Sequence, residues 1–532
     1  MTPAHTSTID VFDDAVLLDP YPYLRELRDT GAAVKLEHHD VWFVGRYLDV
    51  KNCLADPETF SAHRGVGLAY QFNRLAEGTG ILSTEGPQHQ LLRRILMRDL
   101  NTRRLRSVQT QVHAQAHNLV GGLVKDGHFD AVTDLARVFP LSVVCAFLGL
   151  PTQDRELILT LADAGINSFG PLNERTLRGF PEYHRLLRYL SSVAVPPNLL
   201  PGGAGKTIYQ AVDGGEITET QAAALISAYL VAGIDTTINS VSNALHQLSQ
   251  HSDQWTQLRA EPDKLIPQVL LEVIRYDPPV QMMTRTVTRD VLIDEVPVRA
   301  GERVLLSYAS ACRDERQYPE PDRFDIHQNP RDHLGFGHGE HNCVGSGLAR
   351  LETTAVLRAM VAHVESYTCG EPERHLNNVV RGLASLPVTI TATASLSGML
   401  DDFENERGQA VPAALGCEET SLEPRIRSEF IHKLADVAPV GPQRHPEAAG
   451  RDFVLCPRDE EFEDVSTVLD RELGRVGRQR ESLRGSGATS PVGQRQLGNS
   501  GHDRCPFDDQ SQFLGTDRPY QGKLPVDDHD GN

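Results

Sequence analysis

One stretch of the chain constrains its structure more than any other, the sequence HLGFGHGEHNCVGSGLARLE at residues 333–352. Gly335, Gly337 and Gly339 give this stretch a backbone that can bulge and approach a flat ligand closely. Cys343 follows the glycines, and the residues after it read as the start of a helix. A thiolate just before a helix N-terminus is stabilised by free N–H groups and by the helix dipole. Such a soft, anionic sulfur can bind a transition metal.

The pattern F-G-x-G-x-H-x-C-x-G is complete around this cysteine, at Phe336, Gly337, Gly339, His341, Cys343 and Gly345. Through this pattern the chain resembles the cytochrome P450 family, whose haem iron is bound by a cysteine thiolate. A buried structural cysteine beside a flexible loop is the alternative, and six matched positions disfavour it. The resemblance implies heme b as the cofactor and Cys343 as the metal ligand, with Phe336 and Gly337 in the haem-binding loop.

Two charged residues upstream fit the same resemblance. Glu272 and Arg275, in LLEVIRY, lie three residues apart on one face of a predicted helix. Such pairs are common on solvated helix faces, but this one precedes the cysteine loop with PDRF at residues 321–324 between them. The pair is similar to the family's ExxR motif, with Arg323 as its partner. The resemblance implies a buried charge network that holds the haem core together.

Polar residues interrupt the long predicted helix Thr218–Gln250 where apolar residues are expected. The segment AGIDTT at residues 232–237 contains glycine, aspartate and threonine, which are poor helix-interior residues. A threonine that bonds back to a carbonyl and bends the helix is the alternative reading. The resemblance implies that Asp235 and Thr236 relay protons to dioxygen at the haem and that Gly233 leaves room for it. The presence of both favours oxygen-dependent monooxygenation over a peroxide-consuming reaction.

Haem propionates are anionic and need cationic or hydrogen-bonding partners. His89 and Arg93, one helical turn apart in GPQHQLLRRIL, are similar to the family's HxxxR pair. Arg285 and His341 occupy the other matching positions. Each residue alone reads as a surface charge, whereas the set at family positions predicts contact with the propionates.

Within the family the chain is most similar to bacterial members that oxidise para-substituted benzoates, such as 4-methoxybenzoate O-demethylases. The likeness lies in RGVGL (64–68), NSFGPLNE (167–174), GIDTTIN (233–239), PPVQMMTRTVTRDV (278–291) and NNVVRGLASLPVTI (377–390). It implies an apolar pocket above the iron that suits a flat aromatic ring. Ordinary core packing is the alternative for each of its residues, which are Leu82, Ile166, Phe169, Val231, Ala232, Val280 and Met283.

The sequence departs from those benzoate enzymes where they bind the carboxylate. Their Arg-Ser pair before the helix break is replaced by Ser227 and Ala228. An Arg and a Ser in the loop before His89 are replaced by Ala76 and Thr79, although Arg74 is close by. Because a buried carboxylate without a cation is strongly disfavoured, the substrate is either a neutral phenolic ether or a benzoate held differently.

The resemblance also implies the reaction and the redox partners. Two electrons come from NAD(P)H through a reductase and a ferredoxin, and oxidation of a methoxy methyl group gives formaldehyde and a phenol. Basic residues such as Arg94 and Arg103 are expected to dock an acidic ferredoxin. Two alternatives remain: a non-catalytic haem-based sensor, and a self-sufficient enzyme that uses a fused electron-transfer tail.

Composition limits the partners and the surroundings of the chain. Its 72 acidic and 52 basic residues give a net charge of −20, which disfavours nucleic-acid binding. No apolar run approaches the roughly 20 residues that span a bilayer, and the first residues lack the features of a secretory signal. None of the eight cysteines forms a CxxC pair, so a zinc ribbon has no support. We therefore expect a cytoplasmic protein with reduced thiols.

Apolar periodicity predicts a mostly helical body from about residue 10 to 398. The predicted helices are Tyr21–Arg28, Val108–Val124, Thr218–Gln250 and Pro262–Tyr276, and the predicted strands are Val41–Gly45, Val291–Val298 and Val304–Leu306. With the resemblance, the fold expected for residues 1–398 is mainly α with small β-sheets, the α-rich triangular prism of cytochrome P450.

Residues 399–532 are expected to form a low-order C-terminal extension. Residues 401–532 hold 26 acidic and 16 basic side chains and few long apolar runs, so they can bury little surface. Cys417, Cys456 and Cys505 are too dispersed to hold an iron–sulfur cluster. One helix is predicted at Val465–Val476, and a misread reading frame is a further alternative for the whole extension.

Overall fold

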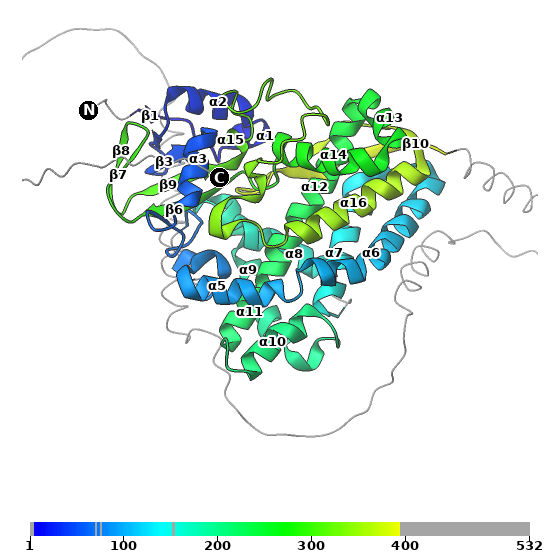
Figure 1. Cartoon of the computed structure of the whole chain (residues 1–532), viewed down its shortest axis with the longest axis horizontal. Helices are drawn as coiled ribbons and strands as arrows, with labels where there is room; N and C mark the ends of the chain where they lie inside the picture. Colours follow the sequence, from blue (N-terminus) through cyan, green and yellow to red (C-terminus); the bar gives the residue numbers. More distant parts are fainter. Residues whose placement is uncertain (1–4, 70–71, 75–76, 152–154, 394–532) are drawn as a thin grey trace, which may run out of the picture. The chain divides into compact units, whose positions relative to one another are not determined.

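A computed structural model describes residues 5–69, 72–74, 77–151 and 155–393 of the chain. These residues form a helix-rich body with small sheets (Figure 1), as the sequence predicts. The C-terminal extension expected from residue 399, its predicted helix at Val465–Val476 and its three cysteines lie outside the described residues, as does Ala76.

Most of the helices bury one apolar face against their neighbours and expose the other. In chain order they are α1 (Asp14–Leu18), α2 (Tyr21–Thr30), α3 (Tyr47–Ala55), α5 (Gly86–Met97), α6 (Thr102–Leu123), α7 (Val138–Leu148), α8 (Arg155–Asn167), α9 (Glu174–Ser192), α10 (Ala204–Asp213), α11 (Glu219–Gly233), α12 (Asp235–Gln250), α13 (Ser252–Ala260), α14 (Pro262–Tyr276), α15 (Tyr308–Ala311) and α16 (Ser346–His363).

The largest sheet has six strands in the order β1-β2-β3-β9-β6-β4. These are β1 (Thr6–Ser7), β2 (Val34–Leu36), β3 (Val41–Val44), β4 (Phe60–Ser61), β6 (Met282–Val287) and β9 (Arg303–Ser307). The pairs β1–β2 and β3–β9 are parallel, and the other neighbours are antiparallel. Side chains alternate between its two faces, so Trp42 packs in one apolar cluster and Phe43 in another.

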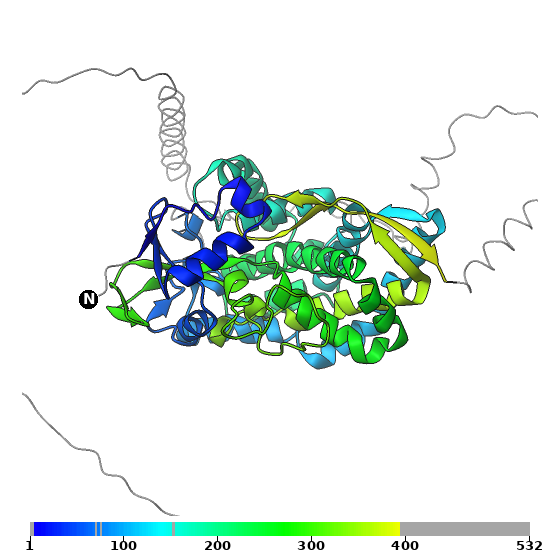
Figure 2. The same cartoon turned by 90° about the horizontal axis from the view of Figure 1, so that it is seen from above.

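The other sheets are smaller. Strands β10 (Val364–Cys369), β13 (Pro387–Ala392) and β5 (His128–Asp130) form a three-stranded sheet, and β11 (Glu373–His375) pairs with β12 (Gly382–Ser385). Figure 2 shows the strands β10 to β13, in yellow, along one side of the helices. The predicted stretch Val291–Val298 is a hairpin of β7 (Val291–Ile293) and β8 (Val296–Val298), because Asp294 adopts φ 53° and reverses the chain.

The predicted helices are present, and their ends have local causes. Helix α14 has the predicted bounds, and Pro262 opens it at the position where a missing N–H costs nothing. Thr218 and Gln221 cap the start of α11 reciprocally. The long predicted helix Thr218–Gln250 divides at Ile234 into α11 and α12, at the polar segment where the sequence predicts a break.

Close helix packing positions the cysteine loop. Helix α16, which follows Cys343, packs along α6, and a Cβ on Gly347 would lie 2.8 Å from Leu105 Cδ1. Gly347 therefore allows the close contact between these two helices. On the other side of the loop, Gly335 packs against the end of α14, where a Cβ would meet Ile274 at 2.5 Å.

Two described stretches, Ala131–Leu148 and Glu219–Gln250, are long and apolar enough to cross a membrane by composition alone. They are 67% and 50% buried within the structure. Burial of this kind is what core helices of a globular body show, so the apolar composition has an explanation in the fold.

Candidate active site

The loop before Cys343 is shaped by two glycines and one backbone bond. Gly337 and Gly339 have φ values of 71° and 72°, which side chains with a Cβ rarely adopt. A Cβ on Gly339 would collide with the carbonyl oxygen of Leu54. The Cys343 N–H donates to the carbonyl oxygen of Phe336 at 2.8 Å and closes the loop. The glycine spacing therefore serves a tight fold that directs the cysteine to the start of α16.

The Cys343 side chain is exposed, yet burial raises the pKa of its thiol. Both observations hold together when the sulfur borders an open space inside the protein rather than bulk solvent. The N–H groups of Gly345 and Ser346 and the cations Arg93 and Arg350 oppose the rise and favour the thiolate. The structure thus presents a sulfur, accessible from within, to which a metal can bind.

The four predicted propionate partners gather next to this cysteine. The ring centroids of His89, on α5, and His341 lie 4.4 Å apart. Arg93 Nη1 donates to the carbonyl oxygen of Asn342 at 2.9 Å. Burial, followed by the charges of Arg285, His89 and Arg93, lowers the pKa of His341 to about 3. Segments far apart in the sequence thus supply one cluster of two arginines and two histidines.

This cluster fits an anionic group. Both ring nitrogens of His89 and Nε2 of His341 are buried and, among the described residues, have no hydrogen-bond partner. Buried nitrogens without partners are unfavourable, and carboxylates such as haem propionates would satisfy them. A haem requires a ligand for its iron and partners for its propionates. The accessible thiol and these unpaired nitrogens can supply both, so the residues fit a haem.

Two carboxylates beside the cluster were not predicted. Glu85 and Glu340 have oxygens within 4.8 Å of each other and of a His341 nitrogen. Burial, with the charge of Glu85, raises the pKa of Glu340. Glu85 accepts hydrogen bonds from Ser61 Oγ at 2.9 Å and from the Ala62 N–H at 2.6 Å. Neither residue belongs to a sequence motif, so only the fold reveals them.

The predicted pair Glu272 and Arg275 forms a bidentate ion pair with both side chains fully buried. Arg275 also donates to the carbonyl oxygens of Cys312, Pro321 and Arg323. The structure differs from the prediction at Arg323, whose side chain is 62% exposed and pairs with Glu320. Only its backbone carbonyl joins the buried network, because the chain turns the guanidinium outward.

The break between α11 and α12 opens one helix side to an interior space. Ala232 is exposed and Gly233 is half-buried, although Val231 and Ile234 on either side are buried. A Cβ on Gly233 would meet nothing closer than Val144 Cγ2 at 3.8 Å. Thr236 Oγ1 donates to the carbonyl oxygen of Ala232, four residues earlier, at 2.7 Å. This is the hydrogen bond to a helix carbonyl that the sequence offers as the alternative interpretation of the segment.

Asp235, beside this threonine, has an unusual environment. Burial, with the charge of Asp163, raises its pKa to about 8, while His375 and Arg137 act in the opposite direction. Its Oδ2 is buried and bonds to no donor in the described part of the chain. Asp163 and His375 were not predicted, because they are 212 residues apart in the sequence and nothing in either segment marks them.

The predicted substrate-lining residues come from four separate segments. Val280 and Met283 pack against both the helical core and the core beside the six-stranded sheet, at the seam between them. Leu82 and Phe169 are partly buried against the helical core, and Ile166 is fully buried. Ser227 and Ala228 are half-buried on α11. Ala232 is exposed on α11, whereas Ile166 and Val231 are buried core residues.

The sequence does not predict two further buried titratable groups. Glu352, on α16, is buried with a pKa well above its ordinary value, which burial causes. His333 is buried, with neither ring nitrogen bonded to another described residue, and burial lowers its pKa to about 4. Both lie within the segment that the sequence singles out, but their burial is a tertiary property that no residue pattern indicates.

Comparison with known proteins agrees with this geometry. A model of the cytochrome P450 family matches residues 205–391. Cytochrome P450 CYP199A2 of Rhodopseudomonas palustris is 37% identical over 388 residues, which cover 72% of this chain and 94% of that protein. Cytochrome P450 monooxygenase PikC of Streptomyces venezuelae is 30% identical over 386 residues, which cover 70% and 91%.

Solved structures show the same likeness. Cytochrome P450 CYP268A2 of Mycobacterium marinum, in complex with pseudoionone, superposes with a TM-score of 0.67 at 26% identity and covers 73% of this chain and 100% of that one. An intact type IV self-sufficient cytochrome P450 monooxygenase superposes with a TM-score of 0.66 at 25% identity. That match covers 77% of this chain and 56% of the other.

Proposed function

The chain belongs to the cytochrome P450 family of haem-b monooxygenases and has that family's fold, and from this premise we propose that it oxidises a small aromatic compound with Cys343 as the ligand of the haem iron. The observation that carries the proposal is the Cys343 thiol, which is accessible from inside the protein and lies near the cations Arg93 and Arg350, together with the unpaired ring nitrogens of His89 and His341. Dioxygen and two electrons from NAD(P)H are the co-substrates.

The haem, when bound, supplies the iron centre at which dioxygen is activated. The chain provides its anchorage. The N–H groups of Gly345 and Ser346 point toward the sulfur and hold it as a thiolate. His89, Arg93, Arg285 and His341 would hold the propionates, and Phe336 and Gly337 would form part of the loop that holds the haem. Glu272 and Arg275 fix the segment from which this loop departs.

Asp235 and Thr236 handle protons at the helix break. Because burial raises the pKa of Asp235 to about 8, its carboxyl group holds a proton at neutral pH and can donate it. Thr236, whose hydroxyl bonds to the carbonyl oxygen of Ala232, is the neighbouring hydroxyl group that passes protons on. Gly233 adds no side chain to the space beside them.

The substrate binds at the seam near Ala232, Val280 and Met283, with Leu82, Ile166, Phe169 and Val231 around it. Apolar side chains there suit an aromatic ring. The substrate class rests on the likeness to benzoate-oxidising members and is a methoxy-benzoate or a phenolic ether. Oxidation of the methoxy methyl group releases formaldehyde and leaves a phenol, with one oxygen atom of O₂ reduced to water by two electrons and two protons.

Electrons come through separate partners, a ferredoxin and its reductase, in the cytoplasm. Arg94, on α5, and Arg103, on α6, are exposed and offer positive charge to an acidic ferredoxin. The charge-reversing variants Arg94→Glu and Arg103→Glu should slow reduction of the protein and make the rate less dependent on salt. An unchanged rate in both would remove this docking site.

The likeness to a self-sufficient monooxygenase favours a second candidate, in which the chain carries its own electron-transfer part. Flavin or iron–sulfur absorbance in the purified full-length protein would support that candidate. Turnover that requires added ferredoxin and reductase supports the first.

The test of the function begins with a panel of matched ligands added to the haem-loaded protein. We expect methoxy-aromatic compounds to shift the spin state of the iron and to be demethylated with NADH, ferredoxin and reductase. Comparing 4-methoxybenzoate with neutral methoxyphenols separates the two substrate classes. A protein that binds haem but turns over none of these compounds would be a sensor or an enzyme for another substrate, and the proposal would be wrong.

A further inference from the structure

Two carboxylates and one imidazole meet between the start of α5 and the cysteine loop. An oxygen of Glu85, an oxygen of Glu340 and a nitrogen of His341 all lie within 4.8 Å of one another. Within the described residues, no other three histidine, cysteine, aspartate or glutamate side chains come together this closely. The segments that supply them are far apart in the sequence, so the fold has brought together three potential metal ligands.

The imidazole nitrogen of this set has no partner. The His341 side chain is 7% exposed, and its Nε2 is buried without a hydrogen bond to any described residue. Glu340 Oε1, which is also buried and unpartnered, lies 3.5 Å from this nitrogen, farther than in an ordinary hydrogen bond. Two ligands of a tetrahedral metal ion with bonds of about 2.0–2.2 Å are about 3.3–3.6 Å apart. The separation therefore suits two atoms that bind the same ion.

Neighbouring donors hold Glu85 in place. Glu85 is the N-cap residue of α5, but its side chain makes no hydrogen bond to the start of the helix. Instead, its Oε2 accepts a hydrogen bond from Ser61 Oγ at 2.9 Å, and its Oε1 accepts the Ala62 N–H at 2.6 Å. Carboxylates that bind metal ions are commonly oriented by such outer hydrogen bonds. Because each carboxylate oxygen has a second lone pair, Glu85 can still bind a cation.

The charges in this place favour a cation over another anion. In the described part of the chain, neither Glu85 nor Glu340 forms a salt bridge with a lysine or an arginine. Arg285, whose charge acts on Glu340, donates to the carbonyl oxygen of Thr284 at 2.8 Å. A propionate at His341 Nε2 would be a third carboxylate beside two others, which repulsion disfavours. A cation can take Nε2, while Nδ1 of the same ring donates to a propionate, as histidine ligands commonly do to carboxylates.

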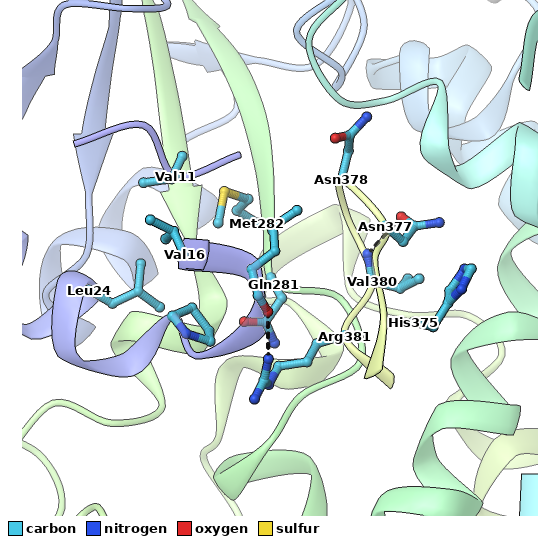
Figure 3. A pocket seen from close by; sticks show the side chains of 12 residues that line it. Val11, Val16, Leu24, Gln281, Met282, His375, Asn377, Asn378, Val380 and Arg381 are labelled. Atoms are coloured by element: carbon cyan, nitrogen blue, oxygen red, sulfur yellow. Dashed lines mark hydrogen bonds between the residues drawn. The ribbon is translucent and has the colours of Figure 1, made fainter. Parts of the chain in front are cut away.

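The cavity in Figure 3 lacks these features, although a histidine borders it. The cavity measures about 20 Å³, and the residues around it include His375 and the cation Arg381 but no carboxylate. Nε2 of His375 already lies 2.7 Å from Asp163 Oδ1. A cation in this cavity would therefore meet a like charge without an anion to offset it, so the cavity does not suit a metal ion.

We propose that Glu85, Glu340 and Nε2 of His341 bind a divalent first-row transition-metal ion, for which Zn²⁺ is the probe. Imidazole favours such ions over Mg²⁺ and Ca²⁺, which prefer oxygen ligands. Three protein ligands leave one position of a tetrahedral ion for water. The two carboxylates and the ion are neutral together. This ion is a second metal besides the haem iron, and its binding does not depend on the proposed substrate.

The test adds Zn²⁺ to the untagged, haem-loaded, full-length protein after a chelator has removed other divalent ions. Calorimetry measures the affinity and the number of ions bound. Glu85→Gln and Glu340→Gln each remove one ligand, and we expect each to bind Zn²⁺ at least about tenfold more weakly than the wild type. The Glu340 side chain is 27% exposed, so Glu340→Gln decides the question should Glu85→Gln fail to fold.

Two control variants change similar groups elsewhere. Glu77→Gln makes the same chemical change at an exposed contact, where His63 Nε2 lies 4.0 Å from Glu77 Oε1. His117→Gln removes half of an imidazole pair that Zn²⁺ could also use, because His363 Nε2 lies 3.1 Å from His117 Nδ1. We expect both controls to bind Zn²⁺ with the affinity of the wild type.

X-ray absorption at the zinc edge identifies the ligands independently of the affinity. We expect oxygen ligands and one imidazole in the wild type. Two imidazoles would place the ion at His117 and His363, and a sulfur at about 2.3 Å would place it at a cysteine. Either spectrum would overturn the proposal, as would a wild type that binds no Zn²⁺ or a Glu340→Gln variant that binds it equally well. None of these measurements requires turnover, so failure of the proposed oxidation is seen separately.

Discussion

Arg275 and Glu272 face each other through two hydrogen bonds, Nη2 to Oε1 at 2.7 Å and Nε to Oε2 at 2.8 Å, and neither side chain reaches solvent. The remaining Arg275 nitrogen, Nη1, donates to the carbonyl oxygens of Cys312 and Pro321. Glu272 Oε1 also accepts the N–H of Asp325 at 2.9 Å. One ion pair thereby ties helix α14 to the irregular segment that leads into the cysteine loop.

Arg275→Ala leaves the Glu272 carboxylate buried without its cation, and we expect it to lower the free energy of unfolding by about 3–5 kcal/mol. Arg323→Ala is the matched control, because its guanidinium is exposed and only its backbone carbonyl takes part in the network. A surface change of this kind should cost no more than about 0.5 kcal/mol. Urea unfolding of both haem-loaded variants measures the difference, and equal losses would contradict the assignment of the network to Arg275.

Cys343→Ala should abolish the carbon-monoxide difference spectrum that is characteristic of thiolate-ligated haem, because among the described cysteines only Cys343 has an exposed side chain. Cys369→Ala, on β10, makes the same change at a half-buried thiol elsewhere and should leave the spectrum intact. The measurement is the reduced, carbon-monoxide-bound spectrum of each purified protein after haem supplementation. An unaltered spectrum in Cys343→Ala would mean that another group binds the iron.

The sequence predicts what depends on neighbours along the chain and misses what depends on distant contacts. Helix α14 was predicted with its bounds because a proline opens it and its apolar residues repeat at helical spacing. The break at Ile234 was predicted because glycine, aspartate and threonine stand together in a long apolar helix. Arg323 was misassigned because the motif gives the residue type and order, whereas the direction of its side chain depends on the local turn.

The contacts around Asp235 show the same limit more sharply. Asp163 and His375 meet only because α8 and the β11–β12 hairpin are folded beside the helix break. Glu85 and Glu340 likewise come together from segments 255 positions apart in the numbering, without a motif in either. The family motifs give the positions that they contain, and groups outside those motifs have to be found in the fold.

Asp235 should make stability depend on pH in a defined direction. Folding raises its pKa from the ordinary value of 3.8 to about 8, so the folded protein holds this proton more tightly than the unfolded chain. The resulting stabilisation is fully present below about pH 4 and is lost as the pH rises through about 8. Asp235→Asn does not titrate, so its stability relative to the wild type should increase from about pH 4 to 8 and then level off.

Urea unfolding of the two proteins at a series of pH values measures this difference. Asp56→Asn serves as the control, because hydrogen bonding with Thr59 lowers the pKa of Asp56 in the folded state. Its effect on stability should be constant between about pH 5 and 8, where Asp56 stays ionised in both states. If the difference in unfolding free energy between Asp235→Asn and the wild type does not change over the same pH range, Asp235 is ionised in the folded protein.

Arg93 and Arg94 are neighbours on α5 with different surroundings, and they should differ in their effect on haem retention. Arg93 donates to the Cys343 loop through Asn342, whereas Arg94 is exposed. Loss of a charge-assisted hydrogen bond of about 1.5–3 kcal/mol corresponds to about 10- to 150-fold weaker binding. Transfer of haem to apomyoglobin should accelerate to this extent in Arg93→Ala and be unchanged in Arg94→Ala. Equal rates would remove Arg93 from the haem site.

Ala232 distinguishes a substrate space from ordinary core packing. It is exposed on α11 although its neighbours Val231 and Ile234 are buried, so a larger side chain has room to enter. Ala232→Leu should leave the free energy of unfolding unchanged within about 0.5 kcal/mol but abolish the spin-state shift with methoxy-aromatic ligands. Ala222→Leu, on the same helix at a position with 0% exposure, should instead cost about 1–3 kcal/mol from overpacking. If Ala232→Leu destabilises the protein as much as Ala222→Leu does, the residue is core and the pocket lies elsewhere.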